Sequence, residues 1–121
     1  MTELITFPDV EALCVTALNG FLTDCKASTK VPNPRPDKLV LVTCIGGIRR
    51  NVGIDAPVVL FECWSTDEVS AQELGARVRA FVYSMDEYGY EGSRLVNNPD
   101  SETNLPRYQF QAGLFLAAEP L

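Results

Sequence analysis

The four cysteines are the residues of this sequence best suited to metal binding or nucleophilic chemistry, and they lie at positions 14, 25, 44 and 63. A tetrahedral zinc site takes cysteine and histidine ligands, usually in closely spaced pairs. The chain holds no histidine and no Cys-x-x-Cys pair, so a zinc site would need all four separated thiolates to converge. The lack of histidine also removes the Ser-His and Cys-His arrangements that activate a nucleophile. We therefore expect reduced cysteines, with Cys14, Cys44 and Cys63 acting as small hydrophobic residues in apolar segments.

Carboxylates are the remaining option for acid–base catalysis. The acidic pairs at 67–68 and 86–87 fall at the ends of an expected helix, where capping and solvation explain them. Glu62 differs because it interrupts an apolar strand, and a carboxylate buried there needs a partner. Arg107 or an arginine of another subunit could pair with it, while simple exposure and catalysis are the alternatives. Gly46–Gly47 precedes neither a Lys-Ser pair nor a helix, so it is no phosphate loop, and the sequence predicts neither an enzyme nor a cofactor.

Composition and charge limit the partners of the chain. Its 121 residues, 46% of them hydrophobic, predict one globular domain over residues 1–121. Ten basic against sixteen acidic residues give a net charge of −6, so we expect repulsion of nucleic-acid phosphates and no sequence-specific DNA binding. No apolar run reaches the roughly 20 residues of a membrane helix, and the acidic start at residues 1–3 is unlike a signal peptide.

The hydrophobic pattern predicts two helices and four strands in the order α-β-β-α-β-β. Apolar residues recur at helical spacing between Thr6, the expected N-cap, and Asp24, and again from a Ser65–Glu68 capping box to Met85. The expected fold is α+β, a mainly antiparallel four-stranded sheet with the helices on one face. The expected strands span residues 38–44, 56–64, 93–97 and 107–118.

Two connections between these elements could contact other molecules. Residues 25–37 contain three prolines at alternate positions, which favour a stiff extended arm with no strand of its own. Such an arm either joins the first helix to the sheet or reaches for a neighbouring molecule. Residues 45–53 are rich in turn formers and carry Arg49 and Arg50, so they predict an antiparallel hairpin with a basic tip.

Three stretches of the sequence, in this order and spacing, resemble a known family. The first is Val31–Pro36, which leads into a strand that ends at Gly46–Gly47. The second is Asp55–Ser65 with the helix that follows it. The third is Asn98–Asp100, with Pro106–Phe110 opening the last strand. Together they span nearly the whole chain and resemble the tail terminator proteins of long-tailed (siphovirus) bacteriophages that infect actinobacteria.

This resemblance implies a structural role in the virion. Tail terminators form a hexameric ring at the head-proximal end of the tail tube, end its polymerisation, and join the tail to the head or neck. The implied partners are further copies of this chain, the tail tube protein, a neck or head-completion protein, and viral DNA that passes through the lumen without sequence-specific contacts. The implied location is the virion tail, after synthesis in the host cytoplasm, with no membrane involved.

Two other assignments stay open at this point. Another neck or head-completion protein of the same virus class would share the size, fold and partners of a tail terminator, and a small enzyme or ligand-binding domain is the second alternative. If the chain is a tail terminator, the proline arm, the basic hairpin tip and several further charged residues are expected to contact neighbouring subunits. These candidates are Pro32, Pro34, Arg35, Pro36, Arg49, Arg50, Glu62, Arg77, Arg79 and Arg107.

Overall fold

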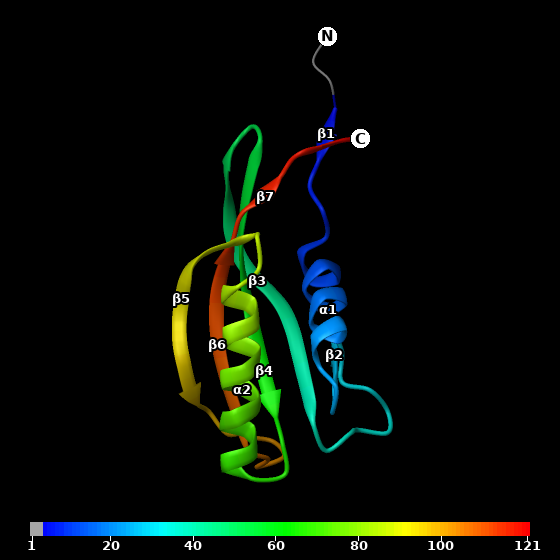
Figure 1. The fold of residues 1–121 in the computed structure, drawn as a ribbon, viewed down its shortest axis with the longest axis vertical. Coiled ribbons are helices and arrows are strands. Elements are labelled where there is room, and N and C mark those ends of the chain that lie inside the picture. The colour runs from blue at the N-terminus through cyan, green and yellow to red at the C-terminus, as the bar shows by residue number, and fades with distance from the viewer. Residues whose placement is uncertain (1–3) are drawn as a thin grey trace.

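The computed structural model describes residues 4–121, and the acidic start at residues 1–3 lies outside them (Figure 1). Within the described range the chain forms two helices and eight strands. Most strands belong to one sheet, while two short strands near the ends of the chain pair with each other. The elements are β1 (Ile5–Thr6), α1 (Val10–Phe21), β2 (Lys26–Ser28), β3 (Leu39–Asn51), β4 (Ile54–Trp64), α2 (Glu68–Tyr83), β5 (Tyr88–Asn97), β6 (Arg107–Leu114), β7 (Leu116–Ala117) and β8 (Glu119–Pro120).

The main sheet is mixed and has six strands, whereas the sequence predicted a mainly antiparallel sheet of four. Its strands lie in the order β2-β3-β4-β6-β5, and β7 pairs with β4. β2 runs parallel to β3, and the other neighbours are antiparallel. The α+β class is confirmed. The expected count of four is wrong because β2 is too short to be recognised from alternation, and because the expected strand over residues 107–118 is interrupted at Phe115 and so forms both β6 and β7.

The expectation that the arm at residues 25–37 contains no strand is wrong at β2. Asn19 of α1 holds the middle residue of that strand, because its Nδ2 donates to the Ala27 carbonyl oxygen (3.0 Å) and its Oδ1 accepts from the Ala27 N–H (2.8 Å). The Ala27 side chain is buried. This contact between helix and strand fixes β2 beside β3, and no local sequence pattern indicates it. The rest of the arm is loop.

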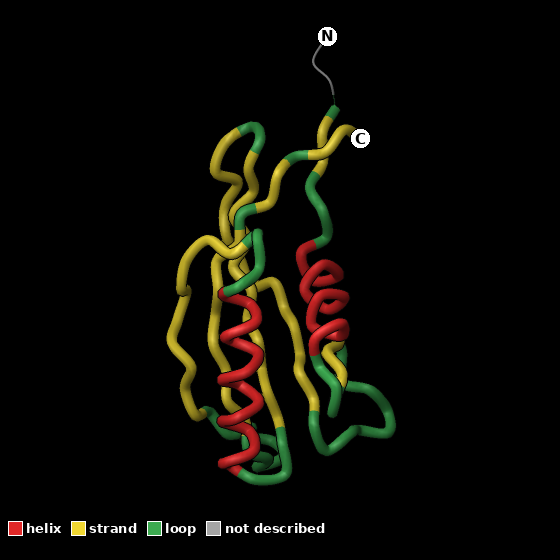
Figure 2. The backbone as a smooth tube through the Cα atoms, viewed as in Figure 1, coloured by secondary structure: helices red, strands yellow, loops and turns green. Residues whose placement is uncertain are grey.

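β3 and β4 form the antiparallel hairpin that the sequence predicted, with longer strands than expected. β3 continues through residues 45–51, and the chain turns only at Val52–Gly53. The register shifts between Cys44 and Gly46, which marks a bulge, and Gly47 adopts φ +108°, a value that favours glycine. Figure 2 shows that the distal half of the hairpin extends beyond both helices.

The last two expected strands are present with different bounds. β5 begins at Tyr88, before the expected position 93, and shows three register shifts against β6. β6 ends at Leu114, and after Phe115 the chain pairs with β4 again as β7, in the same register as β6. The register shifts of β5 mark bulges. Bulges bend an edge strand such as β5 and make it a poor template for pairing with another strand.

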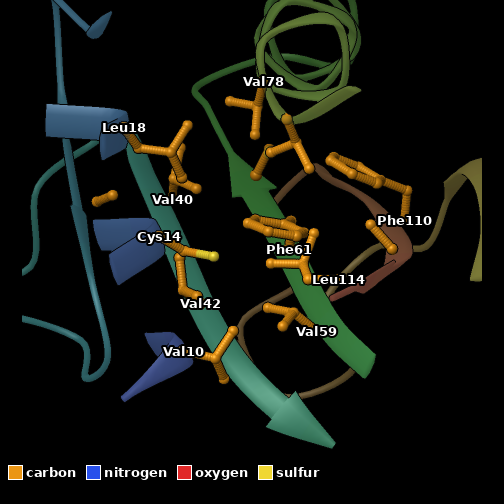
Figure 3. Close-up of a cluster of buried hydrophobic side chains, with 14 of the residues drawn as sticks. Val10, Cys14, Leu18, Val40, Val42, Val59, Phe61, Val78, Phe110 and Leu114 are labelled. Atoms are coloured by element: carbon orange, nitrogen blue, oxygen red, sulfur yellow. The ribbon is translucent and has the colours of Figure 1, made fainter. Parts of the chain in front are cut away.

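The core lies between both helices and one face of the main sheet (Figure 3). Because side chains alternate along a strand, Val42, Phe61 and Phe110 all point to this face. The rings of Phe61 and Phe110 stack with their centroids 4.9 Å apart. Leu18 of α1, which lies beside Val40, and Val78 of α2 belong to the same core on the helix side. The opposite face of the sheet, which carries the intervening residues, has no helix on it.

Aspartates cap both helices, rather than the hydroxyl residues that we expected. Asp9 Oδ1 accepts from two backbone N–H groups of the first turn of α1, at 3.0 and 3.3 Å, so the expected cap at Thr6 is wrong. Asp67 caps α2 in place of Ser65, and its Oδ1 accepts from a backbone N–H at 2.8 Å. A carboxylate is well suited to both places because the helix dipole is positive there.

The cysteines lie at four separate places and form no disulfide. Cys14 and Cys63 are buried as expected; burial raises the pKa of Cys14 to about 12 and also raises that of Cys63. Cys44 is exposed, which corrects the expectation for it; it lies where the regular pairing of β3 with β4 is interrupted by the bulge. Among residues 4–121, no group of three or more His, Cys, Asp or Glu side chains is placed to hold a metal ion.

Candidate functional site

Arg35, Glu62, Trp64 and Arg107 form a cluster, the tryptophan cluster, where β4 ends and β6 begins. The guanidinium carbons of Arg35 and Arg107 lie 5.0 and 5.3 Å from the centroid of the Trp64 ring. Arg107 Nη1 also donates to Glu62 Oε2 at 3.0 Å. A guanidinium over an indole face is an attractive cation–π arrangement. The single tryptophan of the chain therefore gathers cations from the arm and from β6.

The register of two strands positions most of this cluster. Trp64 lies directly opposite Arg107, and Glu62 is two residues before Trp64 on the same face of β4. That face is the one without helices, because Phe61 and Cys63 point into the core. Trp64 is nevertheless only 4% exposed. The arm and the arginine side chains cover it in place of a helix.

Glu62 is a half-buried carboxylate with an intramolecular partner. The side chains of Glu62 and Arg107 are 14% and 16% exposed. Burial raises the pKa of Glu62, and the positive charge of Arg107 opposes that rise only in part. Arg107 is itself held by the Asn98 carbonyl oxygen, which accepts from its Nε at 2.8 Å. Of the partners that the sequence left open for Glu62, the structure shows Arg107 of the same chain.

The proline arm packs on its own chain through Arg35. Pro32, Pro34 and Pro36 line an open hollow of about 490 Å³ together with Asp24. Within residues 4–121, the buried atoms Arg35 Nη2 and Trp64 Nε1 have no hydrogen-bond acceptor. Each such donor costs roughly 1–3 kcal/mol. The arm is therefore held by stacking and packing, with little directional bonding.

Replacing Arg35 with alanine should shift the fluorescence emission of Trp64 to longer wavelength, because the indole loses the side chain that covers it. The stability loss should be small, about 0.5–1 kcal/mol for one cation–π contact. Emission spectra and urea unfolding of the purified variant measure both effects. Lys30→Ala, which removes an exposed cation from the same arm, is the control and should leave the emission unchanged. An unchanged spectrum for Arg35→Ala would show that the arm does not cover Trp64.

The candidate arginines of α2 pair with carboxylates of their own chain. Arg77 Nη2 lies 3.1 Å from Asp24 Oδ2, which also accepts from Lys38 Nζ at 2.7 Å. These two cations, Lys38 foremost, lower the pKa of Asp24 to about 2. Arg79 Nη2 lies 2.8 Å from Glu91 Oε1 on β5. Both arginines thus join α2 to neighbouring segments, which gives them an intramolecular role.

Arg49 and Arg50 lie at the other end of β4 from the tryptophan cluster, on the hairpin tip, residues 48–52 (Figure 1). Arg49 donates to the carbonyl oxygens of Asn51 (3.2 Å) and Val52 (2.8 Å) and lies over the Phe7 ring. The guanidinium carbon of Arg50 lies 4.9 Å from the centroid of the Phe115 ring. Through these hydrogen bonds, Arg49 stabilises the conformation of the turn at the tip.

The structure brings together only three of the ten candidate residues, Arg35, Glu62 and Arg107, and the others lie along the arm, on α2 or at the hairpin tip. Sequence reasoning missed Trp64 as the centre of that cluster, although a large aromatic residue at the end of an apolar strand was visible. It also missed the two aliphatic residues of the tip, Ile48 and Val52, which lie on either side of the two arginines in the sequence.

A comparison of this sequence with protein-family models and with curated proteins finds no match. None of the helices in residues 4–121 is long and apolar enough to cross a membrane. The arrangement of charged residues is one of ion pairs and stacked cations, which can hold strands, arm and helices together. Among residues 4–121, the hairpin tip carries two of the most exposed large hydrophobic side chains, Ile48 and Val52.

Proposed function

We propose that this chain is a tail terminator of a long-tailed bacteriophage that infects actinobacteria. In this role it is a structural virion protein that forms a hexameric ring at the head-proximal end of the tail tube. The ring ends tube polymerisation and provides the surface that joins the tail to the head or neck. The protein works without a cofactor, and viral DNA passes through the ring.

The proposal is carried by the three-part sequence pattern, and one structural observation supports it. The hairpin extends past the helices and presents large aliphatic side chains to solvent: Ile48 and Val52 are each 75% exposed, and Ile45 is 47% exposed. Exposed apolar side chains gathered on a projecting element are typical of contact sites between proteins. A subunit of a ring needs such an element to reach its neighbour.

The net charge of −6 also fits a ring through which DNA passes. Nucleic-acid phosphates are repelled by an excess of carboxylates at long range, so such a wall would bind DNA weakly. Arg77, Arg79 and Arg107 are paired with carboxylates of the same chain, which reduces the positive charge that they offer to DNA.

Cryo-electron microscopy tests this function directly. When the purified protein is added to tail tubes that lack a terminator, we expect a hexameric ring at one end of each tube and no further growth when tube protein is supplied. In the intact virion the same density should lie at the head-proximal tube end. Density in the adjoining neck layer would assign the protein to the neck instead, and a location inside the capsid or a catalytically active monomer would contradict the proposal.

A further inference from the structure

We propose that the hairpin tip of one copy docks into a groove beside α1 of a second copy. This inference rests on the proposed function as a ring subunit and names the two surfaces that meet. The groove, the α1 groove, lies between α1 and the turn that joins α2 to β5, and it measures about 550 Å³. Its lining includes Pro8, Asp9, Leu13, Ala17, Met85 and Glu87.

The hairpin tip combines an aliphatic surface with one available cation. Ile48 and Val52 are mostly exposed, so their burial against a partner would remove apolar area from water. Arg49 bonds to carbonyl oxygens of the turn and is a positioning residue for the tip. Arg50 stacks on Phe115, which leaves the N–H groups of its guanidinium for an acceptor outside the tip. The tip therefore offers apolar contacts beside a positive charge.

The α1 groove has the complementary character. Leu13, Ala17 and Met85 give it an apolar lining, and Asp9 and Glu87 add two carboxylates. Asp9 uses its Oδ1 to cap α1, so it is a fixed negative charge. The backbone of Glu87 is held by its carbonyl oxygen, which accepts from the Phe115 N–H at 2.8 Å. Aliphatic residues beside an arginine thus meet apolar residues beside carboxylates, and this charge complementarity identifies a second copy as the occupant.

The positions of tip and groove suit a ring. They are different patches, so the contact is head-to-tail and every copy both gives a tip and receives one. Both lie toward the same end of the molecule: the hairpin projects from the end at which α1 begins and α2 joins β5 (Figure 1).

Opposite charge reversals test the contact. Arg50→Glu places a carboxylate on the tip and leaves both carboxylates of the groove, and Glu87→Arg places a guanidinium in the groove and leaves both arginines of the tip. We expect each variant alone to lower ring formation by about tenfold or more. An equal mixture of the two should restore rings, because the variants can alternate around a ring with an even number of subunits. An effect within one chain could not be rescued by mixing.

Two readouts separate this inference from the proposed function. Sedimentation velocity measures ring formation by the protein alone, and electron microscopy measures the fraction of tail tubes that carry a ring. Arg94→Glu, the same charge reversal at an exposed residue of β5, is the matched control and should behave as the wild type. Circular dichroism checks that each variant is folded.

Restoration by mixing in either readout supports the contact. Rings formed normally by either single variant, or no restoration in the mixture, would overturn it while leaving the function intact. Variants that form rings but fail to cap tubes would place the tip against the tube protein and also overturn it. Mixture-dependent rings that cap no tube would support the contact and overturn the proposed function.

Discussion

Replacing Arg107 with glutamine should destabilise the isolated protein by about 2–4 kcal/mol at pH 8, because it leaves the Glu62 carboxylate half-buried with no cation beside it. Arg107 also lies over Trp64 and donates to the Asn98 carbonyl oxygen, so the variant loses these contacts as well. Urea unfolding followed by Trp64 fluorescence measures the loss. The loss should be smaller at pH 5 than at pH 8.

The direction of this pH dependence follows from the pKa of Glu62. Burial raises that pKa, and Arg107 opposes the rise, so removal of Arg107 should raise the pKa further. A carboxyl group whose pKa is higher in the folded than in the unfolded state favours folding most below its unfolded pKa, about 4.3 for glutamate. That contribution is lost as the pH rises through the folded pKa. The Arg107→Gln variant should therefore regain stability, relative to the wild type, as the pH falls from 8 toward 5.

Glu62→Gln is the matched counterpart. It leaves the Arg107 guanidinium without its carboxylate, and a guanidinium keeps its charge throughout this pH range. The raised pKa of Glu62 in the wild type favours folding less as the pH rises, so the stability deficit of Glu62→Gln, about 1–2 kcal/mol, should be smaller at pH 8 than at pH 5, the opposite of the trend for Arg107→Gln. The double variant should be more stable than the sum of the single losses indicates, because neither charge remains unpaired. Additive losses with no pH dependence would contradict a coupled, half-buried pair.

The parts of the fold that the sequence predicted are those with a long periodic pattern. The apolar stripe of α1 extends over more than two helical turns, β4 is a long apolar run, and β6 shows regular alternation, so the type of each element was clear. β2 has three residues and is held by the Asn19 side chain, a contact across eight positions that no local pattern shows. The choice of Asp9 over Thr6 as cap depends on where the preceding backbone bends, which propensity does not determine.

In the candidate site, too, contacts within the sheet could be predicted from the sequence, whereas contacts between distant segments could not. Arg107 was a candidate partner of Glu62 because adjacent strands of one sheet bring diagonal residues together. The position of Arg35 over Trp64 depends on the path of the arm, which its prolines stiffen but do not direct. The pairing of Arg77 with Asp24 joins the end of α1 to α2, and such contacts between distant segments follow from tertiary packing.

Replacing Gly47 of the hairpin with alanine should also lower the stability of the protein strongly, because this position has no room for a side chain. A Cβ at this position would contact the Ala56 carbonyl oxygen and lie 2.6 Å from Pro57 Cα and 2.9 Å from Val58 N, at φ +108°. All three are backbone atoms of β4, so relief requires the strands to separate. Gly47→Ala should therefore destabilise the protein by on the order of 2–4 kcal/mol.

Glycines elsewhere in the chain are matched controls for this variant. A Cβ at Gly20, in the last turn of α1, meets no atom within 4 Å, and Gly20→Ala should stabilise the protein by about 0.5–1 kcal/mol because alanine favours the helix. Opposite signs for the same chemical change would separate the clash at Gly47 from any general effect of a methyl group. Thermal unfolding by circular dichroism gives both signs.

Hydrogen exchange should locate the damage from Gly47→Ala in the distal half of the hairpin. The strand pairs below the bulge, such as Val42 with Phe61, belong to the core and should keep their protection. The amides of residues 48–56 depend on pairing beyond the bulge and should exchange faster. On the proposed contact between copies, this variant should also fail to form rings although its core stays folded, because the tip no longer has a fixed position. Normal rings from a variant with an unprotected hairpin would show that the tip is not the element that holds neighbouring subunits together.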